Sequence, residues 1–356
     1  MKGMLRFKGT ITAQGPLAVS YPGAGQEIPT TPSGTPMLYG NTLRGPLRHI
    51  GYKVIRDLLA KAQGVSESDI FELADAYMLG IGFDMTNAVG DEDSKNIEPL
   101  AEVKLRESNP FLGLFGRWKL RGFAEVSPLI GDEAAQTMTY GAGSRRDPFE
   151  ADGEEAQFLS EADRQMLVGI KSGDAAIHEQ IMALNQAIKE HKRQIVHVDD
   201  KDEKKKINSK IRDLESQVKE LKGSKAGGKE SVKHPFDGFP ALAPNSRLSS
   251  KITVASGSEV ELGLLLLILR AFARSPFLGG HRANGCGEVR FEYQVSLWEA
   301  DTDAPTILGT VSGGLDEGFV IDGDTLRDAL DSFVANIQSF DFKMVTLKEA
   351  AGKKGG

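Results

Sequence analysis

The sequence predicts an α+β fold in which a large helical insertion interrupts a ferredoxin-like (RRM-like) core. The predicted elements follow the order strand, long loop, helix, two middle strands, helix, glycine-rich loop and strand, which is the order of a ferredoxin-like fold with insertions. Between residues 160 and 235 the pattern changes to charged heptads, which are typical of a protruding pair of helices. We therefore assign residues 1–136 and 236–356 to the core.

Composition limits the possible classes of protein. The chain has 356 residues, of which 40% are hydrophobic, enough for a substantial core in one elaborated domain or two. It has no apolar run of eighteen residues and opens on a strand-like segment, which predicts a cytoplasmic protein without a membrane partner. Its one cysteine, Cys286, excludes an intramolecular disulfide and a cysteine-based zinc cluster. The net charge of −7 argues against a generic nucleic-acid-coating protein but allows a local basic groove.

The first predicted strand spans residues 5–13, where apolar and polar side chains alternate. A long loop rich in proline and glycine follows over residues 14–39. Between Gly9 and Leu43 there is no Lys, Arg, His or Asp, and Glu27 is the only carboxylate. A lone carboxylate is a poor metal or acid–base site, so this loop argues against catalysis.

Residues 37–62 predict a helix that Asn41 or Thr42 caps. Its inner face carries Leu43, Leu47, Ile50, Val54, Leu58 and Leu59. Arg44 and Arg48 are four residues apart and share one face near the helix N-terminus. Two cations there oppose the helix dipole, and an anion at the same place would explain them. The alternative is a solvated helix face.

Residues 110–130 predict a short turn and then a strand, after a helix at 66–79 and a polar loop at 80–98. One side of the strand carries Trp118, Leu120 and Phe123. The other side carries Arg117, Lys119 and Arg121. Cations with a period of two form a basic stripe, which indicates either a solvated face or a groove for a chain of phosphates.

Residues 137–155 predict an extended loop or hairpin that combines aromatic and basic side chains. These are Tyr140, Arg145, Arg146 and Phe149. The combination suits backbone neutralisation together with base stacking, although it also arises by chance.

The insertion predicts two heptad-patterned helices. Apolar residues recur at heptad spacing from Ile177 to Val198 and again from Ile207 to Leu221, with the charged run DDKDEKKK between them. The simplest arrangement is an antiparallel hairpin that turns at this charged run. Such a hairpin is more often a structural or contact arm than a catalytic element.

The C-terminal part carries the segment that organises the fold. A strand at 247–255 leads into a buried helix with a cap signal at Ser256 and Ser258. A glycine-rich loop follows at 279–287, and then a half-buried strand that begins at Val289. Glycines let N–H groups converge on a phosphate, whereas the alternative is a tight connection that only satisfies turn geometry. Two short strands, a helix at 324–338 and a last strand at 342–347 complete the prediction.

Three segments carry a family resemblance. MLYGNTLRGPLR (residues 37–48), PFLGLFG (110–116) and FLGGHRANGCGEV (277–289) resemble segments of the RAMP (repeat-associated) superfamily of CRISPR effector proteins. Asn41 and Thr42 stand where paired serines are common in that family, and Tyr39 replaces a proline. Within the superfamily the chain looks most like the Cas-seven-like backbone type, and in particular the type IV backbone protein.

The resemblance implies a non-catalytic backbone subunit of an antiviral ribonucleoprotein. Such a subunit polymerises as a filament along the guide (CRISPR) RNA, presents its bases to a target nucleic acid, and contacts other effector subunits. Residues 137–159 would form the thumb that displaces a base, and type IV systems are thought to act on plasmid DNA. No cofactor or metal is expected. The residues expected to bind RNA are Asn41, Thr42, Arg44, Arg48, Arg117, Lys119, Arg121, Met138, Tyr140, Arg145, Arg146, Phe149, Gly279, Gly280, His281, Arg282 and Asn284.

Two alternatives remain open from the residues. A ribonuclease acting on guide precursor or target RNA would need an acid–base pair, for which His281 with His49 or Tyr39 is the candidate. Relatives that cut target RNA carry an Asp in the first loop, and this chain has none there. The other alternative is a scaffold that binds only protein through the heptad hairpin.

Overall fold

The computed structural model divides the chain into two compact units. Unit 1 comprises Met1–Tyr140 and Phe239–Gly356, and unit 2 comprises Gly141–Gly238. The structure describes the chain except residues 1, 22–26, 87–88, 90–99, 141–142, 145–158, 197–200, 224–234, 237 and 352–356. Each unit is considered by itself.

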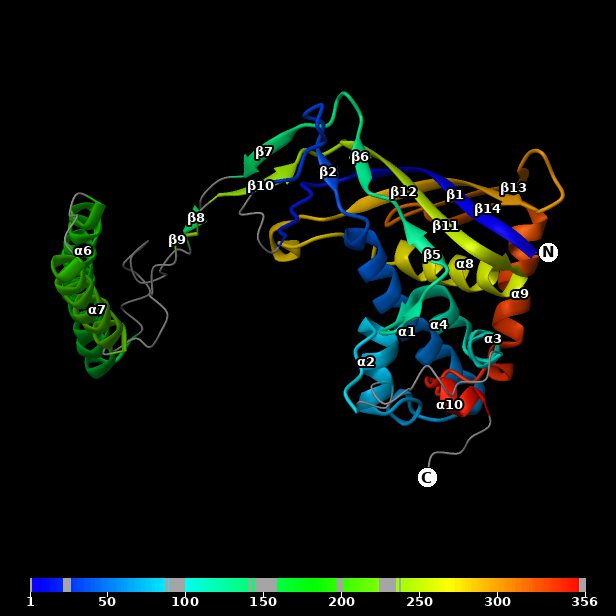
Figure 1. The fold of residues 1–356 in the computed structure, drawn as a ribbon, viewed down its shortest axis with the longest axis horizontal. Coiled ribbons are helices and arrows are strands. Elements are labelled where there is room, and N and C mark those ends of the chain that lie inside the picture. The colour runs from blue at the N-terminus through cyan, green and yellow to red at the C-terminus, as the bar shows by residue number, and fades with distance from the viewer. Residues whose placement is uncertain are drawn as a thin grey trace. The chain divides into compact units, whose positions relative to one another are not determined.

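Unit 1 has an antiparallel sheet with helices packed on it, which confirms the predicted α+β class (Figure 1). The strand order is β14-β13-β12-β1-β11-β6-β2, and β5 also pairs with β11. The strands are β1 (Lys2–Ala13), β2 (Met37–Leu38), β5 (Ala124–Val126), β6 (Leu129–Gly131), β11 (Arg247–Ser258), β12 (Val289–Trp298), β13 (Thr306–Gly314) and β14 (Gly318–Asp322). Alternate residues of β1, such as Leu5 and Phe7, are fully buried, because one face of the sheet packs on the helices.

The helices of unit 1 are α1 (Asn41–Gln63), α2 (Leu73–Ile81), α3 (Ala101–Ser108), α4 (Pro110–Phe115), α8 (Glu259–Ala273), α9 (Asp324–Ala335) and α10 (Leu347–Ala350), with short 3-10 turns η1 (Glu67–Asp69), η4 (Arg282–Asn284) and η5 (Ile337–Ser339). Figure 1 shows α1, α8 and α9 on one side of the sheet. The capping signal before α8 is confirmed, because Ser258 Oγ accepts the N–H of Val260 at 3.1 Å and Glu261 accepts the N–H of Ser258 at 2.8 Å. Nearly every residue of α8 is buried, so this helix forms the centre of the core.

Three predictions about local structure are wrong. The segment predicted as a turn before residue 117 is the helix α4, which Asn109 caps by accepting the N–H of Leu112 at 3.1 Å. The helix α1 begins after Gly40 without a side-chain cap, so neither Asn41 nor Thr42 has the predicted role. Residues 342–347 form no strand, because the amide of Asn109 binds the carbonyls of this segment at 3.0 Å and holds it in an irregular conformation.

The described part of the predicted loop or hairpin at 137–155 pairs with the segment that follows the insertion. In unit 1, β7 (Thr137–Tyr140) pairs with β10 (Phe239–Leu242). In unit 2, β8 (Gly143–Ser144) pairs with β9 (Pro235–Phe236). The predicted thumb residues Arg145, Arg146 and Phe149 lie outside the described residues.

Unit 2 contains the predicted pair of helices, α6 (Glu161–Val196) and α7 (Lys201–Gly223). Their shared core is a cluster of Ile181, Ile188, Ile211 and Val218. Lys192 pairs with Glu215 across the helices at 3.0 Å. The charged run is not all turn as predicted, because α7 begins at Lys201 and only residues 197–200 separate the two helices. In the described part of the chain no helix is long and apolar enough to cross a bilayer.

Candidate functional site

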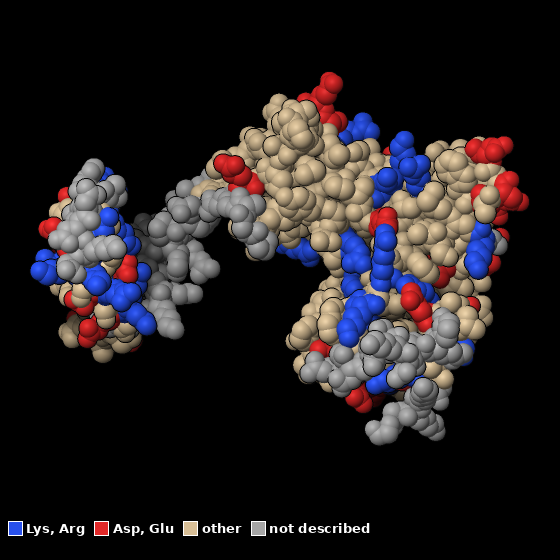
Figure 2. All heavy atoms as spheres, in the orientation of Figure 1, with Lys and Arg blue, Asp and Glu red and all other residues tan. Residues whose placement is uncertain are grey.

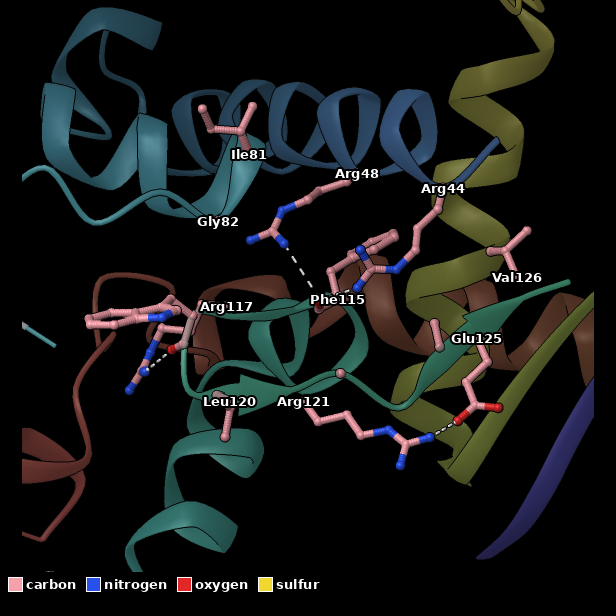
Figure 3. A pocket seen from close by; sticks show the side chains of 13 residues that line it. Arg44, Arg48, Ile81, Gly82, Phe115, Arg117, Leu120, Arg121, Glu125 and Val126 are labelled. Carbon is pink, nitrogen blue, oxygen red and sulfur yellow. Dashed lines mark hydrogen bonds and ion pairs between the residues drawn. The ribbon is translucent and has the colours of Figure 1, made fainter. Parts of the chain in front are cut away.

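The main candidate site is a pocket of about 590 Å³ in unit 1, which we call the arginine pocket. Its walls come from α1, the end of α2, α4, β5 and a small hairpin of β3 (Gly116–Arg117) and β4 (Leu120–Arg121). Four arginines line it, namely Arg44, Arg48, Arg117 and Arg121, against one carboxylate, Glu125 (Figure 3). Figure 2 shows Lys and Arg side chains gathered in a band over the middle of this unit.

The hairpin β3–β4 corrects the predicted basic stripe. Trp118 and Lys119 form its turn, and Lys119 has a φ of 61°, so the alternation of a continuous strand is broken here. Arg117 is buried, and its guanidinium donates to the carbonyls of Val345 and Trp118, each at 2.7 Å. Arg121 is exposed and pairs with Glu125. The cations therefore have different environments and do not share one face.

Arg44 and Arg48 form the floor of the pocket. Arg48 donates to the carbonyls of Leu79 at 2.6 Å and Met78 at 2.7 Å, in the last turn of α2. Both arginines also donate to the carbonyl of Phe115, at the end of α4, as Figure 3 shows. The C-terminus of a helix carries partial negative charge. The dipoles of α2 and α4 therefore attract the guanidinium groups at these contacts. Arg48 is only 6% exposed, so the alternative of a solvated helix face is wrong for this residue.

The glycine at the end of α2 makes room for this arrangement. Gly82 has a φ of 79°, in the left-handed region that favours glycine. A Cβ on Gly82 would lie 2.9 Å from a guanidinium nitrogen of Arg48. A side chain at this position would therefore displace the Arg48 guanidinium from the pocket floor.

The positive charge of the floor is met by backbone carbonyls and, among the described residues, by no carboxylate. Neither Arg44 nor Arg48 forms an ion pair with a carboxylate among the described residues. Burial lowers the pKa of Arg44, and burial together with the charge of Arg44 lowers the pKa of Arg48 to about 10. A buried charge without a counter-charge is costly, so an anion bound here would be stabilised by both arginines.

Two exposed apolar side chains stand at the rim of the pocket. Ile81 is 63% exposed and Trp118 is 56% exposed. Lys119 Nζ lies 4.7 Å from the centroid of the Trp118 ring. A basic floor with an indole at the rim suits a ligand that carries both a phosphate and a flat ring.

A second feature is a stack of three rings at the base of β7 and β10. Phe239 lies between the other two rings, with centroid distances of 3.9 Å to His281 and 6.1 Å to Tyr140. The planes of Phe239 and His281 differ by only 7°. Two predicted RNA-binding residues, Tyr140 and His281, are thus brought together by a phenylalanine that the sequence did not single out. Met138, on the same strand as Tyr140, is 50% exposed.

A third feature is a pocket of about 460 Å³ between α1 and the end of α8. His49, Lys53, Arg274 and Arg282 line it, with Asp57 as the carboxylate. Burial and the charge of Lys53 lower the pKa of His49. Arg282, which was grouped with Arg44 and Arg48 from the sequence, therefore lines a different pocket, where its guanidinium donates to the carbonyl of Phe277 at 3.0 Å.

The glycine-rich loop favours the alternative of a tight connection. Gly279 has a φ of 72°, and a Cβ there would lie 2.1 Å from the carbonyl oxygen of Ala18. The N–H of Gly280 binds the same carbonyl at 2.9 Å, and the N–H groups of residues 284–287 bind carbonyls of the chain. The N–H groups of Gly280 and of residues 284–287 are therefore occupied within the protein and do not point at a phosphate.

The remaining predicted residues have separate positions. Asn41 and Asn284 are exposed, and the hydroxyl of Thr42 is within 2.7 Å of the Tyr21 hydroxyl. The acid–base candidates have different ring partners, since Tyr39 contacts Tyr21 and His281 contacts Phe239. The described residues contain no group of His, Cys, Asp or Glu that would hold a metal ion.

Comparison with known proteins adds no family assignment. The sequence matches no protein-family model, and no similar sequence was found among the curated proteins. The function is therefore inferred from the α+β fold and from the arginine pocket.

Proposed function

We propose that this chain is a non-catalytic, RNA-binding backbone subunit of a CRISPR ribonucleoprotein effector, of the Cas-seven-like type. The observation that carries the proposal is the pair Arg44 and Arg48, which have no carboxylate partner among the described residues and line the same pocket as the exposed ring of Trp118. In the proposed complex one phosphate of the guide RNA occupies the pocket floor, and the neighbouring base stacks on Trp118. Arg121 and Lys119 extend the positive surface along the RNA.

The topology of unit 1 supports a ferredoxin-like core. Four strands in the order β12-β1-β11-β5 are antiparallel neighbours. Along the chain they follow β1, α1, β5, β11, α8 and β12, which is the β-α-β-β-α-β sequence of that fold. In this proposal residues 137–159, which begin with β7, have the thumb position, and Met138 and Tyr140 face the RNA of a neighbouring copy.

A binding role also agrees with the chemistry of the described residues. The His281 ring is stacked on Phe239, and His49 lines the pocket beside α1. No contact joins either histidine to a carboxylate in the described part of the chain. In this proposal the subunit binds RNA, other copies of itself and further effector subunits in the cytoplasm. Other proteins carry out any cleavage. Type IV membership and plasmid targeting are further parts of this proposal.

The experiment that tests the proposal is size-exclusion chromatography with light scattering on protein purified from an expressing host. The ratio of absorbance at 260 and 280 nm reports bound RNA. We expect a large assembly that contains RNA and that becomes smaller when ribonuclease digests the RNA. The R44Q variant should assemble less RNA at the same salt concentration. A nucleic-acid-free monomer that stays monomeric with added guide-length RNA would refute the proposal, and cleavage of that RNA would favour the nuclease.

A further inference from the structure

The face of the sheet that the helices leave uncovered has an unusual composition, and we call it the outer face. It is formed by the outward side chains of β1, β11 and β12, on the opposite side from α1 and α8 (Figure 1). Outward residues on the two central strands are Met4, Arg6, Lys8, Thr10, Thr12, Arg247, Ser249, Lys251, Thr253 and Ala255. Their neighbours along each strand, such as Phe7 and Ile252, are buried in the core. Apart from Met4 and Ala255 near one end, the outer face therefore presents cations and hydroxyl groups on these two strands.

Two positive charges on this face lie opposite each other on neighbouring strands and destabilise the sheet. Lys8 lies directly opposite Lys251 across the pair β1–β11, and like charges in this position are destabilising. Neither β1 nor β11 contains an acidic residue. Among the described residues, no ion pair neutralises Arg6, Lys8 or Lys251. A polyanion across the strands would remove the repulsion between the two lysines.

Acidic residues lie only on the flanking strands. Glu292 on β12 is opposite Thr10, and Glu125 on β5 is opposite Thr253 and pairs with Arg121. Arg290 on β12 lies opposite Thr12, and its guanidinium pairs with Glu317 at 3.0 Å. The positive charge is therefore concentrated over the two central strands and weakens toward the edges. This distribution suits an anionic ligand that crosses the middle of the sheet.

The two central strands present hydroxyl groups and no aromatic ring, which indicates the kind of polyanion. The aromatic side chain at an outward position of β12, Trp298, lies at the end of that strand. Ser and Thr side chains bind phosphates and ribose hydroxyls. Single-stranded nucleic acid is held largely by stacking of bases on aromatic rings, and the outward positions of β1 and β11 carry none. A duplex keeps its bases inside and offers phosphates and sugars, which these side chains match.

We propose that the outer face binds the sugar–phosphate backbone of a nucleic-acid duplex. This site goes beyond the proposed function and does not depend on it, because it shares no residue with the arginine pocket. Lys8 and Lys251 provide the central phosphate contacts, and Thr10 provides a hydroxyl contact beside them. The recognition is by charge and shape, without preference for sequence.

The test is fluorescence anisotropy with a labelled duplex of about 20 base pairs, longer than the ~16 base pairs that a double-strand-binding domain spans. RNA and DNA duplexes of the same sequence, and the corresponding single-stranded RNA, are titrated between about 50 and 200 mM salt. K8Q/K251Q removes two phosphate contacts and should make the slope of log affinity against log salt shallower by about 1.8 for the DNA duplex. K343Q/K348Q, with the same loss of charge on exposed residues distant from β1 in the sequence, should keep the wild-type slope.

The single-stranded probe separates this proposal from the previous one. K8Q/K251Q should bind single-stranded RNA as the wild type does, whereas W118A should lose affinity for it and keep its affinity for the duplex. Thermal unfolding of K8Q/K251Q should be unchanged or higher, because the variant removes a repulsion. The proposal is overturned if the wild-type protein does not bind either duplex at low salt, or if both double variants have the same slope. Tighter binding of polyglutamate than of the duplex would also overturn the proposal, and would indicate that the outer face binds an acidic protein.

Discussion

Replacing Trp118 and Arg44 one at a time should separate the stacking and charge contributions of the arginine pocket. Alanine substitution of an aromatic ring that stacks on a base costs about 1–3 kcal/mol, or roughly 5- to 150-fold in Kd. Trp118 is 56% exposed at the pocket rim, so W118A removes the ring without emptying the core. The ring is uncharged, and the loss should therefore be the same at every salt concentration.

R44Q should behave differently, because it removes one phosphate contact. The slope of log affinity against log salt should become shallower by about 0.7 for single-stranded RNA. Over a fourfold rise in salt this corresponds to about 2.5-fold less weakening than in the wild type. Plotted on logarithmic axes, the W118A line should run parallel to the wild-type line, whereas the R44Q line should converge with it as salt rises.

The assay is anisotropy of a labelled, mixed-sequence single-stranded RNA over the same salt range, with circular dichroism to verify folding. W298A is the matched control, because Trp298 is also partly exposed at 38% but lies at the end of β12, outside the pocket. This control should bind RNA as the wild type does. If W118A binds as W298A does, or if W118A alters the slope as R44Q does, the assignment of stacking to Trp118 is refuted.

Three further predictions concern stability. Asn109→Ala removes a helix cap and two buried hydrogen bonds, and should lower the free energy of unfolding by about 2–4 kcal/mol in urea denaturation; a change below the error would contradict this account. Tyr293→Phe removes the buried 2.8 Å contact to Ser250 and should cost about 1–3 kcal/mol, whereas a neutral result would mean that water replaces the hydroxyl. Replacing residues 141–238 by a short Gly-Ser linker should leave the melting temperature of unit 1 unchanged, since none of the described residues of that segment belongs to its core; loss of cooperative unfolding would show otherwise.

The sequence predicted those elements whose signals are local. Strand alternation placed β1, β11 and β12, and a small-residue cap with acidic residues placed the start of α8. Heptad spacing placed the two helices of unit 2. Strand alternation and heptad spacing have fixed periods that depend only on which side of the element is buried, and the cap signal involves residues within one helical turn. All three are therefore visible without knowledge of the packing partner.

Predictions failed where a short segment depends on a distant one. The helix α4 has only six residues and is held by Asn109, which also binds the carbonyls of Phe342 and Met344. The turn at Trp118 interrupts the expected strand, and no period in the sequence marks it. The stack of Tyr140, Phe239 and His281 joins segments on either side of the insertion, so no local pattern indicated it.

By itself, the sequence determined the α+β class, the insertion and the presence of two arginines near the start of α1. Only the tertiary structure decided what these arginines contact. The ends of α2 and α4 bring carbonyl groups to Arg44 and Arg48, and the β3–β4 hairpin brings Trp118 into the lining of the same pocket. This arrangement arises from burial of apolar residues in several separate segments, and a one-dimensional pattern cannot encode which polar groups that burial brings together.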